Sequence, residues 1–396
     1  MPLFQFIHEG MAREFVILLP RHWKKLLLES TDRQLVSVDE EEGIELGLQP
    51  GTFRLPVVIG MGGAALGSHD FWNAKLDFAQ QMADCNELAL SDFDLSRTEF
   101  AAIGIFPMGL NSKEGDASGW STYANFSNRL YGADDSGWLR PLLREIDRMM
   151  AATLTPDQRA VLESAVPGPL RVMDQDSITL VGHSSGACLA YKIAVRHRDL
   201  VSAFAAINGS GAGWSHHFEM TSTATPWWNL PGTPTPNDTA RPDYTMGAAP
   251  AGEKVHAFLV NSVFDTTFVP DGGPSVQQLT DLQLDYADPG VGATPVPVIG
   301  QYEFDVAIEI VRSDVDTLLQ AEVWADWNSG GFGLRPAPVT TVGMVAGVPA
   351  TIDTWTSPTG QVVRRALSEG DHAWPGGDRS TLWANVIWPF LRDNPK

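Results

Sequence analysis

One serine between two glycines is the best-placed residue of this sequence for nucleophilic chemistry. Ser184 is the centre of Gly182-His183-Ser184-Ser185-Gly186, which follows the apolar run 178–181 and precedes apolar residues at helical spacing. A Gly-x-Ser-x-Gly sequence between a strand and a helix is typical of a nucleophile elbow, a sharp turn that exposes the serine hydroxyl. The glycines are needed because a Cβ atom there would clash where the strand folds back into the helix. Chance matches to so short a pattern occur, and the flanking strand and helix favour the elbow.

A serine nucleophile needs a base that removes its proton and a carboxylate that orients this base. In α/β-hydrolases these residues follow one another in the order serine, acid, histidine, each in a loop after a strand. The sequence offers this order in Ser184, Asp265 and His372. His372 lies in a glycine-rich loop after the last predicted strand, and Asp265 follows an earlier one. We therefore predict these three residues as the catalytic nucleophile, acid and base.

Other acids and histidines compete for the two supporting roles. The competitors are Asp271, Asp305, Asp371, His183, His197 and His256. His183 is poorly placed to reach the neighbouring serine, His197 is expected to cap a helix, and His256 is expected in a buried strand.

The glycine-rich segment after a predicted central strand is the candidate oxyanion hole. The run Leu55 to Gly60 passes directly into Met61-Gly62-Gly63-Ala64-Ala65. Small residues let a backbone N–H approach a substrate oxygen closely. We expect the amides of Gly63 or Ala64, together with that of Ser185, to stabilise an oxyanion. An ordinary strand-to-helix turn would have a similar sequence.

Residues 211–252 carry tryptophans and histidines among prolines, threonines and glycines, with no helical or strand period. A stretch of this length is usually a lid or a binding loop, and a loop packed permanently on the core is the alternative. The candidate substrate-contacting residues are Met61, Trp120, His183, Trp214, Trp227, Trp228 and Trp374. The pair His216-His217 has no cysteine or carboxylate at ligand spacing, so no metal site and no cofactor are predicted.

The alternation of strand and helix patterns predicts one α/β domain over residues 1–396: an α/β-hydrolase fold with a mostly parallel central sheet flanked by helices and lid-like insertions. Residues 211–252 are the expected lid, and residues 270–345 are an expected insertion with helices. The predicted strands are 14–19 (at a sheet edge), 55–60, 101–106, 178–181, 201–207, 255–260 and 362–367. The predicted helices are 72–83, 138–146 (beginning near Asp134 and Asp135), the elbow helix, one or two within 303–327, and 381–391 broken by Pro389, with a small β excursion at 340–355.

The composition narrows the classes of partner. With 43% hydrophobic and 19% charged residues the chain is typical of a soluble globular protein, and no apolar run is long enough to cross a bilayer. A formal net charge of -21 argues against nucleic acid and anionic membranes as partners.

Two cysteines, Cys85 and Cys188, predict no disulfide framework. The N-terminus lacks a signal-peptide pattern, so the protein is expected to be cytoplasmic or to have its leader outside this sequence.

Four blocks of the sequence resemble the polyhydroxybutyrate depolymerase and feruloyl esterase family of α/β-hydrolases. They are LPVVIGMGG (55–63), GW with DDSGWLRPLLREID (119–147), VGHSSGACLAYKIA (181–194) and EGDHAWPGG (369–377). The resemblance implies Ser184 as nucleophile, Asp265 as acid and His372 as base, with Gly63-Ala64 and Ser185 around the oxyanion. The chain departs from the family at Met61, where members usually have histidine, and at Asn261-Ser262, where they have His-Gly.

Taken together, these residues predict a serine carboxylester hydrolase that works through an acyl-enzyme. Its expected substrate is a hydrophobic small-molecule or polymeric ester, such as a polyhydroxyalkanoate, another polyester or a feruloyl-type ester. The alternatives are a hydrolase of oxidised polyvinyl alcohol, a peptidase or acyltransferase on the same three residues, and a non-catalytic binding protein.

Overall fold

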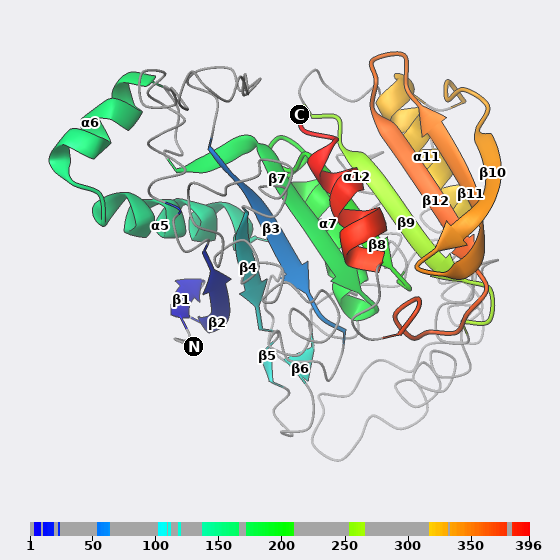
Figure 1. Cartoon of the computed structure of the whole chain (residues 1–396), viewed down its shortest axis with the longest axis horizontal. Helices are drawn as coiled ribbons and strands as arrows, with labels where there is room; N and C mark the ends of the chain where they lie inside the picture. Colours follow the sequence, from blue (N-terminus) through cyan, green and yellow to red (C-terminus); the bar gives the residue numbers. More distant parts are fainter. Residues whose placement is uncertain are drawn as a thin grey trace, which may run out of the picture.

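A ten-stranded sheet organises the part of the chain that the computed structural model describes (Figure 1). The described residues are 4–8, 11–19, 23, 54–63, 102–108, 110–111, 118–119, 137–165, 172–209, 253–265, 317–331, 333–377 and 382–396. The strands, in sheet order, are β1 (Phe4–His8), β2 (Met11–Leu18), β4 (Ile103–Pro107), β3 (Leu55–Met61), β7 (Met173–His183), β8 (Ala203–Ile207), β9 (His256–Ser262), β12 (Val362–Ser368), β11 (Val348–Thr356) and β10 (Val339–Val345).

The six strands from β4 to β12 pair with one another in parallel. At one end of the sheet β2 pairs antiparallel with β4 and β1 antiparallel with β2; at the other end β11 pairs antiparallel with β12 and β10 antiparallel with β11. The two-residue strands β5 (Leu110–Asn111) and β6 (Ser118–Gly119) form a separate pair. The described helices are α5 (Leu139–Ala152), α6 (Pro156–Ala165), α7 (Ser185–Arg196), α11 (Thr317–Ser329), the π-helical turn η5 (Trp383–Ile387) and α12 (Trp388–Arg392).

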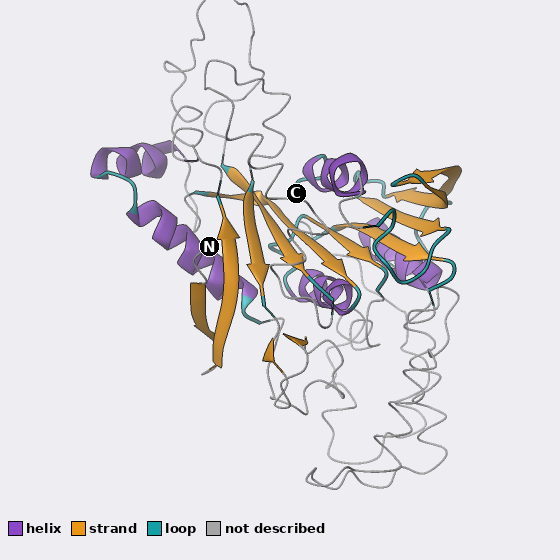
Figure 2. Cartoon of the chain, turned by 60° about the horizontal axis from the view of Figure 1, so that its bottom comes forward, coloured by secondary structure: helices purple, strands orange, loops and turns teal. Residues whose placement is uncertain are grey.

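Helices lie on both faces of the sheet (Figure 2), because the strands are apolar on both sides. Val57 and Ile59 of β3 belong to a core that also contains residues of α5, α7 and α11. Val58, between them, belongs to a second core with residues of η5 and α12 on the other face. Successive side chains of a strand point to opposite faces, so each parallel strand contributes to both cores. The predicted α/β-hydrolase fold is confirmed.

One prediction about the ends of the sheet is wrong. The strand predicted at 14–19 is β2, and it is not at the edge because β1 pairs with it on its outer side. The β structure predicted at 340–355 is confirmed, and its two strands, β10 and β11, extend the main sheet beyond β12. Ala346 and Gly347 between them both have positive φ, as a type I′ hairpin turn requires. Asp353 of β11 forms an ion pair with Arg365 of β12.

The predicted helices are found where the structure describes their residues. The apolar face predicted around Leu139, Leu142 and Ile146 is buried on α5, although the first turn of this helix carries no acidic residue. At the C-terminus, Pro389 does not break the helix: residues 382–392 are helical without a gap, and Pro389 lies in the first turn of α12, directly after the π-helical turn η5. The predicted helix at 72–83, the lid 211–252 and the part of 270–345 before residue 317 lie outside the described residues.

Within the described part of the chain, no helix is long and apolar enough to span a membrane. The described residues also contain no group of three or more side chains placed to hold a metal ion. Cys188 is buried on α7, whereas Cys85 lies outside the described residues.

His256, the first residue of β9, has a buried imidazole, and its protonation lowers the stability of the folded state. Its Nδ1 accepts a hydrogen bond of 2.9 Å from the backbone N–H of Val362, and burial lowers its pKa from 6.5 to about 4. The folded state therefore binds fewer protons than the unfolded state between these pH values, and stability falls as the pH falls. We expect the free energy of unfolding to lose about 3 kcal/mol from this group between pH 6.5 and pH 4.

The variant His256→Asn isolates this effect because its amide oxygen accepts the same hydrogen bond but does not titrate. Urea unfolding at a series of pH values should show a steeper loss of stability in the unmodified protein than in the variant. Equal slopes would contradict a lowered pKa of His256.

Candidate active site

Ser184 lies in the turn between β7 and α7, where the strand and helix predicted on either side are both present. Its backbone has φ 55° and ψ −127°, a conformation that non-glycine residues rarely adopt. A Cβ atom on Gly182 would lie 2.1 Å from the carbonyl oxygen of Gly186, and one on Gly186 would lie 2.2 Å from that of Met61. Both glycines of the motif are therefore required by backbone packing.

The structure brings Ser184, Asp265 and His372 together. His372 Nε2 lies 2.9 Å from Ser184 Oγ, and His372 Nδ1 lies 2.9 Å from Asp265 Oδ2. An ionised carboxylate only accepts hydrogen bonds, so Nδ1–H donates to Asp265 and Nε2 accepts from the serine hydroxyl. The side chain of Asp265 is fully buried, whereas that of His372 is 29% exposed. This tautomer and this order of hydrogen bonds suit the removal of a proton from Ser184.

Parallel strands position the acid and the base. Asp265 follows β9 and His372 follows β12, which are neighbours in the sheet and end at the same edge. The two loops are joined by backbone hydrogen bonds from Val263 N–H to Ser368 O (2.9 Å) and from Phe264 N–H to Gly370 O (2.8 Å). The carboxylate and the imidazole are therefore held together by main-chain contacts as well as by their own hydrogen bond.

Two of the predicted oxyanion-hole residues border Ser184. A Cβ atom on Gly63 would lie 2.9 Å from Ser184 Cβ, so the segment after β3 approaches the serine closely. Ser185 is the first residue of α7, where backbone N–H groups have no acceptor within the helix. Ala64 lies outside the described residues.

The predicted substrate-contacting residues that the structure describes are buried. Met61 is fully buried in the core beneath α7, because it ends a strand covered on both faces. Trp374 is 1% exposed and contacts the ring of His183 edge-on at 5.7 Å between centroids. His183 is itself buried, and its Nε2 lies 3.2 Å from the carbonyl oxygen of His372. These three residues support the site from within the fold, and Trp120, Trp214, Trp227 and Trp228 lie outside the described residues.

Sequence analysis missed two polar residues behind His372. Asn208 directly follows β8 and is fully buried, with Nδ2 donating to the carbonyl oxygens of Asp371 (3.2 Å) and Ala373 (2.6 Å). Ser262, the last residue of β9, donates from Oγ to Asn208 Oδ1 (3.0 Å). The one signal for them in the sequence is their place, because polar residues at the carboxyl ends of buried parallel strands lie beside the site.

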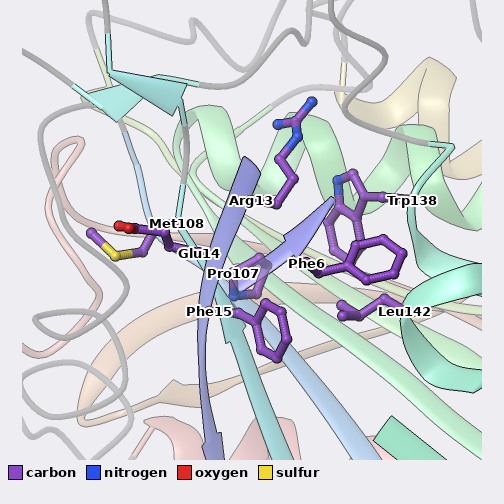
Figure 3. Close-up of a pocket in the computed structure, with 8 residues that line it drawn as sticks. All are labelled: Phe6, Arg13, Glu14, Phe15, Pro107, Met108, Trp138 and Leu142. Carbon is purple, nitrogen blue, oxygen red and sulfur yellow. The ribbon is translucent and has the colours of Figure 1, made fainter. Parts of the chain in front are cut away.

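A separate pocket lies toward the β1 edge of the sheet (Figure 3). It adjoins β2 and the end of β4, whereas Ser184 follows β7 on the far side of β3. The residues that line it are Phe6, Arg13, Glu14, Phe15, Pro107, Met108, Trp138 and Leu142. Ser184, Asp265 and His372 do not line this pocket.

Comparisons with solved structures give remote matches to esterases. They include an acetyl xylan esterase from Aspergillus awamori, with 11% identity, 98% of this chain and 100% of that chain covered, and a TM-score of 0.40. A ferulic acid esterase matches with 12% identity, 67% and 79% coverage and a TM-score of 0.32. A Bacillus cereus carboxylesterase matches with 10% identity, 75% and 92% coverage and a TM-score of 0.29.

No family model matches the sequence, and no curated protein matches it. At these identities and TM-scores the solved structures transfer no activity to this chain. The function of this chain is therefore inferred from the geometry around Ser184.

Proposed function

We propose that this protein is a serine ester hydrolase with Ser184 as nucleophile, His372 as general base and Asp265 as the acid that orients it. The observation that carries this proposal is the pair of 2.9 Å hydrogen bonds that link the three side chains. The strained backbone of Ser184 supports it as well, because such strain is typical of a nucleophile elbow.

The reaction begins when Ser184 Oγ attacks the carbonyl carbon of the ester and gives its proton to His372 Nε2. The buried carboxylate of Asp265 stabilises the imidazolium that forms. The backbone amide of Ser185, with that of Gly63 or Ala64, stabilises the negative charge on the carbonyl oxygen. When the tetrahedral intermediate collapses, the ester C–O bond breaks and the leaving alcohol takes the proton from Nε2.

The second half of the reaction regenerates the serine. His372 Nε2 removes a proton from a water molecule, which attacks the acyl-enzyme carbonyl. The bond to Ser184 Oγ then breaks, Oγ takes the proton back from Nε2, and the carboxylic acid leaves.

The proposed substrate is a hydrophobic or polymeric ester. Support comes from the tryptophans in the 211–252 sequence, Trp214, Trp227 and Trp228, which would provide apolar, aromatic contacts. The resemblance to polyhydroxybutyrate depolymerases and feruloyl esterases favours the same class. A peptidase or acyltransferase would use the same three residues, so the acyl acceptor and leaving group have to be tested directly.

Matched chromogenic substrates test the ester assignment. We expect the purified protein to hydrolyse p-nitrophenyl butyrate and to leave the matched p-nitroanilide essentially unchanged, because the proposed leaving group is an alcohol. Across p-nitrophenyl esters from acetate to octanoate, kcat/KM should rise with acyl-chain length if the acyl group binds apolar side chains. The release of p-nitrophenolate or p-nitroaniline measures both.

Three results would change the assignment. Faster turnover of the anilide would favour a peptidase. Ester formation from an added alcohol at the expense of hydrolysis would favour an acyltransferase. No turnover of any ester by the folded protein would contradict a hydrolase.

A further inference from the structure

The carboxamide of Asn208 bridges the main chain on both sides of His372. Its Nδ2 donates to the carbonyl oxygen of Asp371 at 3.2 Å and to that of Ala373 at 2.6 Å. Carbonyl oxygens only accept hydrogen bonds, so the amide nitrogen must face the loop. The amide oxygen then faces Ser262 Oγ, which donates to it at 3.0 Å. Every polar atom of this side chain therefore has a defined partner and a defined orientation.

The backbone of Asn208 is anchored in the centre of the sheet. Its N–H donates to Val260 O at 2.7 Å, at the carboxyl ends of β8 and β9. Its φ of 47° lies in the left-handed region, which asparagine tolerates better than most residues. The carboxamide thus projects from a rigid, fully buried position onto a loop outside the sheet.

The carbonyl between the two that Asn208 holds is bound as well. His183 Nε2 lies 3.2 Å from His372 O, and a carbonyl acceptor requires Nε2–H to be the donor. Three successive carbonyls, of Asp371, His372 and Ala373, are therefore held by side chains at the carboxyl ends of β7 and β8. β7 leads directly into the turn that carries Ser184, and β8 is its neighbour in the sheet.

We propose that Asn208 is a positioning residue that fixes the imidazole of His372 relative to Ser184 Oγ, and this inference rests on the proposed serine hydrolase function. Without the two hydrogen bonds that Asn208 donates, the loop would keep its contacts through Gly370 and His183 but lose its hydrogen bonds to the residue that follows β8. Small displacements of a general base reduce the rate of proton transfer without weakening substrate binding. Asn208 contacts neither substrate nor the reacting atoms, and acts through the main chain of His372.

Two variants remove the donors in different ways. Asn208→Asp keeps the shape and the tolerance of a positive φ but replaces the NH₂ group by an oxygen acceptor. Asn208→Gly removes the side chain and also suits the positive φ. We expect kcat for p-nitrophenyl butyrate to fall by about 10- to 100-fold in both variants, with KM nearly unchanged. The rate constant for labelling of Ser184 by a fluorophosphonate should fall in parallel, because labelling needs the same activated hydroxyl.

The matched control is Asn328, another fully buried asparagine. Its Nδ2 donates at 2.9 Å to the carbonyl oxygen of Val255, the residue directly before β9. Asn328→Ala should lower the unfolding temperature while leaving kcat and the labelling rate unchanged. A merely structural role for Asn208 would produce this same pattern. Unchanged kcat and labelling rate in the folded Asn208 variants would therefore overturn the proposal.

Ser262→Ala provides a test that does not depend on either Asn208 variant being folded. It removes only the hydroxyl that orients the carboxamide, so kcat should fall several-fold with KM and the fold retained. If both Asn208 variants fail to fold, an unchanged kcat in Ser262→Ala would overturn the proposal. Failure of the hydrolase assignment itself is distinguishable, because the unmodified protein would then show no labelling at Ser184.

Discussion

Replacing Ser184 by alanine is expected to lower kcat for p-nitrophenyl butyrate by about 10⁶-fold, as when the nucleophile of a serine hydrolase is removed. The reason is that no acyl-enzyme forms without Oγ, which lies 2.9 Å from the base that activates it. The fold should persist, because alanine removes one partly exposed hydroxyl and leaves the turn glycines in place. Initial rates measured over a concentration series, with circular dichroism as a check of the fold, give the comparison.

Ser202→Ala is the matched control for this loss. Ser202 is a fully buried serine directly before β8, away from the elbow, and its Oγ donates to Ile178 O of β7 at 3.0 Å. This variant should lose some stability and keep its kcat. Substantial ester hydrolysis by Ser184→Ala would rule out Ser184 as the nucleophile.

The second large effect is expected for Asp265→Asn, with kcat near neutral pH reduced by about 10⁴-fold. The asparagine NH₂ group would donate to His372 Nδ1 and so favour the tautomer that carries its proton on Nε2. That tautomer has no lone pair at Nε2 to receive the proton of Ser184. The carboxylate is fully buried, so this loss would come from the hydrogen bond to His372 rather than from a change in surface charge.

Asp371→Asn distinguishes Asp265 from the acid that precedes His372 in the sequence. Asp371 is exposed, and its Oδ1 accepts the backbone N–H of Ala373 at 2.9 Å, an acceptor role that the asparagine oxygen retains. Its variant should therefore keep most of the kcat. A large loss in Asp371→Asn combined with a small loss in Asp265→Asn would reverse the assignment of the acid.

The part of the site that lies within one stretch of sequence was predictable. The strand, the two glycines and the helix around Ser184 are neighbours in the chain, so their pattern alone indicates the turn. Asp265 and His372 were predictable for another reason: parallel strands bring the residues after their carboxyl ends to one edge of the sheet. The 2.9 Å contacts between their side chains follow from that placement.

The part that depends on distant partners was not predictable. Asn208 binds carbonyls 163 and 165 residues further along the chain, and no local pattern marks that contact. Likewise, the sequence predicted β structure at 340–355 but not its place beside β12, because that pairing depends on distant residues rather than on the composition of the segment itself. Met61 and Trp374 have the residue types of a binding surface, but the sheet and helices cover them.

Reaction of the folded, unmodified protein with a fluorophosphonate, followed by mass spectrometry of the digested adduct, tests the role of Ser184 most directly. The reagent phosphonylates only a serine activated by a neighbouring base, and the peptide map identifies which one. The expected result is one adduct per chain, on Ser184, with simultaneous loss of ester hydrolysis. An adduct on another residue, or full ester hydrolysis by protein that carries no adduct after prolonged treatment, would contradict the account.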